Sequence, residues 1–128
     1  MSKNKILLNS EPDQCKAEWE DSYRDRANFV FYPHEEVIRF FSKYVRKRTG
    51  LDEFQDIGTL SGKRALDLGC GIGRHVMYCY EMGLEAYGID LSDSAVDVAI
   101  KWAARNEVSN PEKKIIQGDI RKLPWPDN

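Results

Sequence analysis

The sequence contains few of the features that mark membrane or secreted proteins. No apolar run approaches the ~18 residues that a membrane-spanning helix needs. The first nine residues carry two lysines, but their apolar stretch is too short for a secretion signal. There are only three cysteines, and without an export signal they are expected to be free thiols in a reducing compartment. These absences predict a globular protein located in the cytoplasm.

The sequence also lacks an excess of charge of one sign. Nineteen basic residues against twenty-one acidic residues give a formal net charge of −2. A protein that coats nucleic acid or an anionic membrane would show a clear basic excess, so neither partner is expected. The chain has 128 residues and no internal repeat, which leaves room for one compact domain at most.

The first 60 residues predict an N-terminal helical cap segment. From Cys15 to about Asn28 the stretch is charged, and Trp19 and Tyr23 stand four apart, so one helical face can carry both rings. A second helix is expected over 33–50. Pro33 suits its first position, and basic residues in its last turn precede a glycine that can form a left-handed cap.

Residues 61–128 have a different character, in which short apolar segments alternate with helical patterns. Strands are predicted at 64–68, 85–90 and 114–119, and helices at about 74–82 and 92–106. When strands alternate with helices over short connections, as here, the strands are expected to pair in parallel with right-handed crossovers. The fold class is therefore α/β, a Rossmann-like doubly wound parallel sheet of which the first βαβαβ half is present.

Glycines and acids gather at the carboxyl ends of these predicted strands, where open α/β sheets bind ligands. Gly69, Gly71 and Gly73 follow the first strand, and without Cβ atoms a ligand can lie almost against the backbone there. Asp90 ends the second strand, where a carboxylate can accept both hydroxyls of a ribose. Asp119 ends the third strand and is placed to reach the exocyclic amine of a base. Together they predict a pocket for an adenine nucleoside.

Two phosphate-binding motifs are missing. The dinucleotide pattern Gly-x-Gly-x-x-Gly would need a third glycine at position 74 or 76, which hold Arg74 and Val76. The stretch from Gly58 to Arg64 has the wrong spacing for a Walker loop and lacks the Ser or Thr that binds magnesium. The glycines are therefore not expected to cradle phosphates, which disfavours a nicotinamide-dependent oxidoreductase.

At these positions the sequence resembles the class I S-adenosylmethionine-dependent methyltransferases. Three stretches match that family's first three motifs in order: Ala65-Leu-Asp-Leu-Gly-Cys-Gly-Ile-Gly-Arg-His75, Tyr87-Gly-Ile-Asp-Leu-Ser92 and Gln117-Gly-Asp-Ile-Arg-Lys-Leu-Pro124. The resemblance covers about residues 61–128. The form of the first motif found here, in which Gly73 is followed by Arg-His, is most similar to that of the small-molecule methyltransferases of this fold. It implies S-adenosyl-L-methionine as cofactor and methyl transfer to a small-molecule acceptor.

The resemblance also implies roles for particular residues. Gly69, Gly71 and Gly73 would border the methionine part of the cofactor, with Asp67 near its amino group.

At the nucleoside end, Asp90 would hold the ribose hydroxyls and Leu91 would pack on the adenine. Asp119 and Ile120 would contact the adenine edge. No catalytic base is identified.

In the family, the stretch that ends here at Asn128 leads into a fourth strand, which pairs beside the first. Residues 61–128 therefore correspond to the first half of the cofactor-binding domain, and we expect the chain to be truncated. Alternatively, a partner chain or a swapped copy in a homodimer completes the sheet. A non-catalytic cofactor-binding fragment that needs such a partner, and a nicotinamide-dependent oxidoreductase, are the alternative functions.

Three further features have more than one interpretation. Cys70, His75 and Cys79 could suggest a metal, but a structural zinc needs four ligands, so no metal site is predicted. Trp19 and Tyr23 are either packing residues or an aromatic lid over a sulfonium. His34, in the first turn of the helix expected over 33–50, is either a solvated or a capping side chain.

Overall fold

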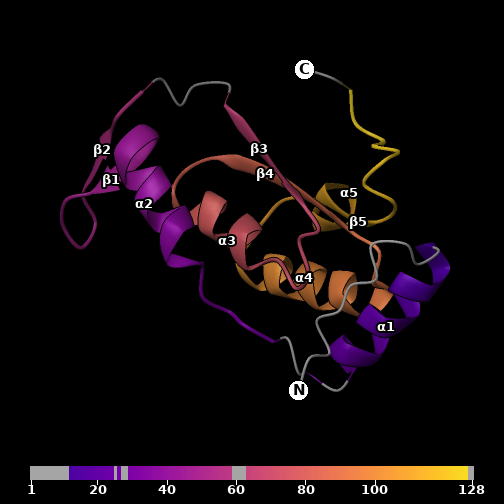
Figure 1. Ribbon diagram of the computed structural model, residues 1–128. Coiled ribbons are helices and arrows are strands. Elements are labelled where there is room, and N and C mark those ends of the chain that lie inside the picture. The colour runs from indigo at the N-terminus through magenta and orange to yellow at the C-terminus, as the bar shows by residue number, and fades with distance from the viewer. Residues whose placement is uncertain (1–11, 25, 27–28, 59–62, 127–128) are drawn as a thin grey trace.

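The computed structural model describes residues 12–24, 26, 29–58 and 63–126 (Figure 1). The N-terminal part holds two helices and a small hairpin: α1 (Pro12–Arg24), α2 (Glu35–Tyr44), β1 (Arg46–Arg48) and β2 (Phe54–Asp56). The rest alternates between strands and helices: β3 (Arg64–Leu68), α3 (Arg74–Glu81), β4 (Glu85–Asp90), α4 (Asp93–Arg105), α5 (Pro111–Lys114) and β5 (Ile115–Gln117). None of the described helices is long and apolar enough to cross a membrane.

The central sheet has three parallel strands in the order β3-β4-β5. Leu68 is opposite Ile89 in the register, and Ile89 is opposite Ile116, so the carboxyl ends of the three strands lie at one edge. The predicted α/β class and the order of its elements are confirmed. This edge is where the glycine turn and the acidic residues meet.

The core lies between the sheet and helices α3 and α4. Val76 of α3, Ala99 of α4, and Ile89 and Ile115 of the sheet have no exposed surface. Burying side chains of this kind removes apolar surface from water, at about 1.5–3 kcal/mol for each larger aliphatic group. The packing is tight enough to require glycine at position 88, because a Cβ there would lie 2.8 Å from Cys70 Sγ.

Both helices that carry the site begin and end as the sequence predicts. Ser92 is the N-cap of α4, and its hydroxyl accepts the N–H of Ala95 at 3.1 Å. Gly83 follows α3 with a φ of +82°, the left-handed conformation that ends a helix most easily at glycine. The starts of α3 and α4 are thereby held at the carboxyl edge of the sheet.

The helix predicted over 33–50 is wrong in its last third. Helix α2 stops at Tyr44, and Arg46–Arg48 form a strand that pairs antiparallel with Phe54–Asp56. The side chain of Arg46 explains the change: its guanidinium lies 4.4 Å from the centroid of the Phe54 ring and its Nε lies 3.1 Å from Asp56 Oδ1. Gly50 lies in the hairpin loop, where its N–H donates to the carbonyl of Glu53 at 3.3 Å.

The two N-terminal helices lie on opposite sides of the α3 N-terminus. Helix α2 packs beside α3 through Phe41 and Tyr78, whose ring centroids are 5.2 Å apart. Helix α1 packs against α4, near the carboxyl ends of the parallel strands (Figure 1). The helix predicted from Cys15 to about Asn28 is observed over Pro12–Arg24, while residues 25 and 27–28 lie outside the described residues.

Candidate functional site

The turn from β3 to α3 contains three glycines in the left-handed region. Their φ angles are +74° for Gly69, +55° for Gly71 and +93° for Gly73, values that other residues rarely adopt. A Cβ built on Gly69 would meet no heavy atom within 4 Å, so this peptide faces open space. A Cβ on Gly71 would lie 2.7 Å from the Tyr23 hydroxyl, so the middle of the turn lies beneath α1.

Asp90 connects the carboxyl end of β4 to this turn. Its Oδ2 accepts the N–H of Gly71 at 2.9 Å, and its Oδ1 accepts the N–H of Ser92 at 2.9 Å. The residue is 9% exposed. Each carboxylate oxygen can accept more than one hydrogen bond, so Asp90 has capacity for a further donor while it holds two amides.

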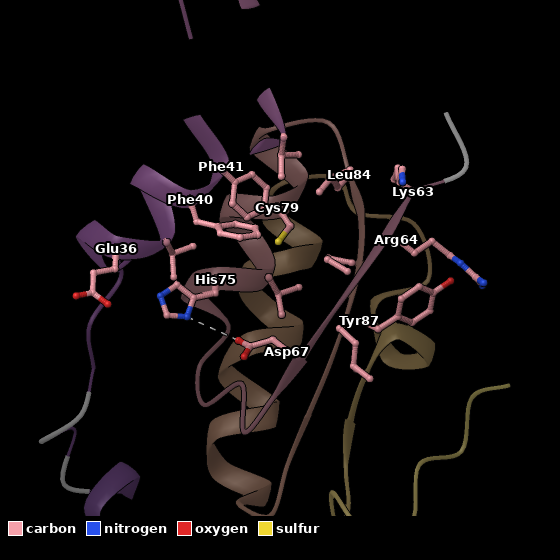
Figure 2. Close-up of a pocket in the computed structure, with 16 residues that line it drawn as sticks. Glu36, Phe40, Phe41, Lys63, Arg64, Asp67, His75, Cys79, Leu84 and Tyr87 are labelled. Carbon is pink, nitrogen blue, oxygen red and sulfur yellow. Dashed lines mark ion pairs between the residues drawn. The ribbon is translucent and has the colours of Figure 1, made fainter. Parts of the chain in front are cut away.

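Asp67 lies in β3, just before the turn, and its carboxyl is poorly stabilised as an anion. Burial, together with the negative charge of Asp90, raises the pKa of Asp67 to about 6, although Arg74 acts in the opposite direction. The nearest ring nitrogen of His75, Nδ1, is 3.9 Å from Asp67 Oδ2 (Figure 2). A carboxyl with a raised pKa gains from a cationic ligand, because the cation stabilises its ionised form.

His75, on the first turn of α3, fixes the chain that leads into α2. Its Nε2 accepts the backbone N–H of His34 at 3.1 Å. Burial, with the charges of Arg74 and His34, lowers the pKa of His75, so the ring is neutral near pH 7. His34 is the N-cap of α2 and its ring accepts the N–H of Glu36, so of the two predicted roles the capping one is observed.

A cavity of about 260 Å³ lies between the glycine turn and α1. It is lined by residues of the turn, by Asp67 and His75, and by Trp19 and Tyr23 of α1. The two aromatic rings stack with centroids 5.9 Å apart. Burial raises the pKa of Tyr23 to about 12, so its hydroxyl stays protonated. Helix α1 with these two rings is called the lid below.

The other predicted site residues lie outside the lining of this cavity. The carbonyl of Leu91 accepts Gln117 Nε2 at 3.1 Å, and Ile120 is 49% exposed. Asp119 accepts Arg121 Nη2 at 2.6 Å and Nε at 3.0 Å, and this pairing lowers the pKa of Asp119 to about 2. The Asp119 carboxylate is thus already paired with an arginine.

A second, larger cavity of about 510 Å³ lies between α2, α3 and β3 (Figure 2). Its walls are mainly apolar and include Phe40, Phe41 and Leu84. Asp67 and His75 line both cavities. These two residues therefore form the boundary between the space under the lid and the space beside α2.

Comparison with known proteins identifies the family to which this arrangement belongs. Residues 66–128 match the family model described as a methyltransferase domain, and this range includes the whole glycine turn, Asp90 and Asp119. The chain belongs to the class I S-adenosylmethionine-dependent methyltransferases. S-adenosyl-L-methionine is the cofactor of this family, which confirms the predicted cofactor.

The curated relatives of this chain are named for chemically different acceptors. It is 32% identical over 74 residues to a sterol 24-C-methyltransferase of Gibberella zeae, covering 57% of this chain and 19% of the relative. It is 33% identical over 67 residues to a mitochondrial ubiquinone biosynthesis O-methyltransferase of Schizosaccharomyces pombe, covering 52% and 24% of the two chains. The chain therefore spans about a fifth to a quarter of the length of these relatives.

A solved structure supports the fold of the chain. The MccD protein aligns with a TM-score of 0.58 and 28% identity, covering 77% of this chain and 39% of that protein. The structural alignment with the MccD protein covers more residues than the match to the family model, so it extends beyond residues 66–128.

Proposed function

We propose that this chain forms the cofactor-binding half of a methyltransferase that transfers a methyl group from S-adenosylmethionine to a small-molecule acceptor. The observation that supports it most strongly is the cavity of about 260 Å³ under the lid. Its lining combines the glycine backbone at Gly69 and Gly71, the aromatic side chains of Trp19 and Tyr23, and the partly buried carboxyl of Asp67. A ligand that combines an amino acid with a sulfonium fits each of these surfaces.

The proposed cofactor contacts follow the geometry of the turn. Gly69 and Gly71 border the methionine portion, and Gly73 allows α3 to begin close to α4, where a Cβ on it would lie 3.2 Å from Ala99 Cβ. Asp67 takes the amino group, because the cationic amine stabilises the carboxylate that burial disfavours.

The nucleoside contacts are proposed at the ends of the next two strands. Asp90 accepts the ribose hydroxyls with its remaining hydrogen-bonding capacity, and Leu91 packs on the adenine. Asp119 and Ile120 flank the adenine edge, with Arg121 holding the Asp119 carboxylate in position.

The residues of the chain contribute alignment and exclusion of water. The cofactor, when bound, supplies an activated methyl group on a positively charged sulfur, so little acid–base chemistry is needed from the protein. Asp67 and Asp90 hold the two ends of the ligand, which fixes the direction of the transferable group. Trp19 and Tyr23 cover the middle of the turn and shield it from water, and aromatic faces attract cations.

A small-molecule acceptor is supported by the sterol and ubiquinone relatives. A protein arginine N-methyltransferase of Oryza sativa is also 33% identical, over 91 residues. Carbon, oxygen and nitrogen acceptors among the relatives suggest that the shared region serves the cofactor and that acceptor binding resides elsewhere.

We further propose two units, an N-terminal cap at 1–60 and the first half of the cofactor domain at 61–128. In the described sheet β3 is at the edge, and two of its leucines are exposed, Leu66 by 43% and Leu68 by 53%. This exposure favours completion of the sheet by further chain or by a partner, and it supports the alternative of a non-catalytic fragment that needs one. The cytoplasmic location stays a prediction.

Calorimetric titration tests the proposal. The 128-residue chain is expected to bind S-adenosylhomocysteine and S-adenosylmethionine saturably and to ignore a reduced nicotinamide dinucleotide. Nicotinamide binding without S-adenosylmethionine binding would favour an oxidoreductase instead. If the chain binds the cofactor but methylates no acceptor until a longer chain is supplied, the fragment alternative is correct.

A further inference from the structure

Glu20 of α1 contacts the first turn of α4, although the two residues that meet are 74 positions apart in the chain. Its Oε1 accepts the backbone N–H of Ser94 at 3.1 Å, and its Oε2 accepts the Ser94 hydroxyl at 2.5 Å. Burial alone would raise the pKa of Glu20, but these bonds, with further ones from Ser92 and Asp93, lower it overall. Glu20 thus acts as a second cap on α4, supplied by another helix.

An ion pair also joins the same two helices. Lys16 Nζ lies 3.1 Å from Asp93 Oδ2. Lys16, Glu20 and Tyr23 are spaced i, i+4, i+7, so they lie along one face of α1. The face that meets α4 is therefore continuous with the aromatic wall of the cavity, and α1 cannot leave α4 without uncovering the glycine turn.

The contact between Glu20 and Ser94 also lies next to Ser92, which is bonded to Asp90, the residue proposed to hold the ribose. Ser92 donates its N–H to Asp90, and its hydroxyl caps Ala95. Asp90 in turn accepts the N–H of Gly71. Hydrogen bonds therefore join the glycine turn to Asp90 and Asp90 to Ser92, and Ser94, two residues further along the same helix turn, joins α4 to Glu20.

We propose that Glu20 is the latch of the lid: its bonds to Ser94 hold α1 closed over the glycine turn and set the rate at which cofactor and product leave. Glu20 is a positioning residue, because it holds the lid and lies outside the lining of the cavity. The release rate depends on the proposed function, whereas closure of α1 on α4 does not. The two parts can therefore be tested separately.

The first measurement needs no ligand. Hydrogen exchange of the α1 amides is compared in wild type, Glu20→Gln and Glu18→Gln. Glu18 is exposed on the same helix, and its substitution makes the same change of charge, so it is the matched control. Exchange over 12–24 is expected to rise on the order of tenfold in Glu20→Gln only, the range for losing charged hydrogen bonds. Equal exchange in the two variants would overturn the latch.

The second measurement is the dissociation rate of S-adenosylhomocysteine in a stopped-flow displacement experiment. Glu20→Gln and Ser94→Ala are expected to speed release severalfold, while Glu18→Gln matches wild type. Faster exchange in α1 with unchanged release would overturn control of release by the latch. If wild type binds no cofactor while α1 exchange still rises in Glu20→Gln, the proposed function fails and the closure by Glu20 stands.

Discussion

The carboxylate of Asp90 accepts the backbone N–H of Gly71 at 2.9 Å, although Gly71 follows β3 and Asp90 is the last residue of β4. This bond ties the carboxyl end of β4 to the turn that follows β3. One side chain therefore both shapes the glycine turn and faces the proposed ribose site, so its removal affects structure and binding together.

Asp90→Ala is expected to weaken binding of S-adenosylhomocysteine by about 1–3 kcal/mol, because the ribose hydroxyls and the Gly71 amide lose their acceptor. Isothermal titration measures the change. Asp97→Ala, an exposed acid on α4, is the control and is expected to bind like wild type. Binding by Asp90→Ala as tight as that of wild type would show that the ribose is held elsewhere.

Gly71→Val is expected to abolish cofactor binding, because its side chain would fill the space between the turn and Tyr23. The backbone is also strained there, since φ is +55°. Gly69→Ala separates the two effects: its φ is +74°, but an added Cβ meets nothing within 4 Å. Thermal unfolding without ligand should therefore show a larger loss of stability for Gly71→Ala than for Gly69→Ala.

Trp19→Leu is expected to weaken binding of S-adenosylmethionine more than that of S-adenosylhomocysteine, which has no positive charge on sulfur. Attraction of a cation to an aromatic face contributes about 0.5–2 kcal/mol. The ratio of the two affinities, measured by titration, reports this contribution directly. Trp102→Leu, at a tryptophan that packs against Phe31, is the control. An unchanged ratio in Trp19→Leu would mean that the ring only packs.

Asp67 predicts a dependence of binding on pH. Its pKa is raised to about 6, so it is mostly protonated at pH 5 and mostly ionised at pH 7. Because only the anion attracts an ammonium group, affinity for S-adenosylhomocysteine should rise about tenfold between these values. Asp67→Asn should remove the dependence. With 5′-methylthioadenosine, which lacks the amino acid portion, the wild type should show none.

As pH rises, the affinity for ligand should increase, but the stability of the ligand-free chain should decrease. In the unfolded chain Asp67 loses its proton near its ordinary pKa of 3.8, whereas in the folded chain it keeps it to about 6. Between about pH 4 and pH 6 the folded state therefore binds more protons than the unfolded state. The contribution of Asp67 to the free energy of unfolding falls as pH rises through this range. Asp67→Asn should be more stable than wild type at pH 7, by about 2 kcal/mol, and similar to it at pH 4. A chemical denaturation series at both pH values measures the difference.

The parallel sheet and its turn could be predicted from sequence because local patterns determine them. Glycines at 69, 71 and 73 permit the left-handed backbone that a tight strand-to-helix turn requires, and Ser92 is suited to cap the helix that follows it. The hairpin could not be predicted in this way. The basic residues at 46–48 suit a helix end equally well, and only contact with Phe54 and Asp56 favours the strand.

The sequence patterns also could not predict that α1 covers the glycine turn. Trp19 and Tyr23 stood out only as two rings on one helical face, an arrangement that packing residues share. Glu20 gave no signal, since its partner Ser94 lies far along the chain and nothing local links the two. The bond from His34 to His75 is likewise long-range, and only the cap formed by the His34 side chain was evident beforehand.

The wide spacing between Glu20 and Ser94 has a consequence for how the molecule assembles. Contacts between distant parts of a chain form late, because a long loop must close before they can contribute. Helix α1 leaves the ribosome before α4, and its docking surface on α4 is not complete until some seventy further residues have been made. We expect the nascent chain to pass through a stage in which β3, β4 and α4 are already in place with the crevice open, and α1 to dock as one of the final steps of folding.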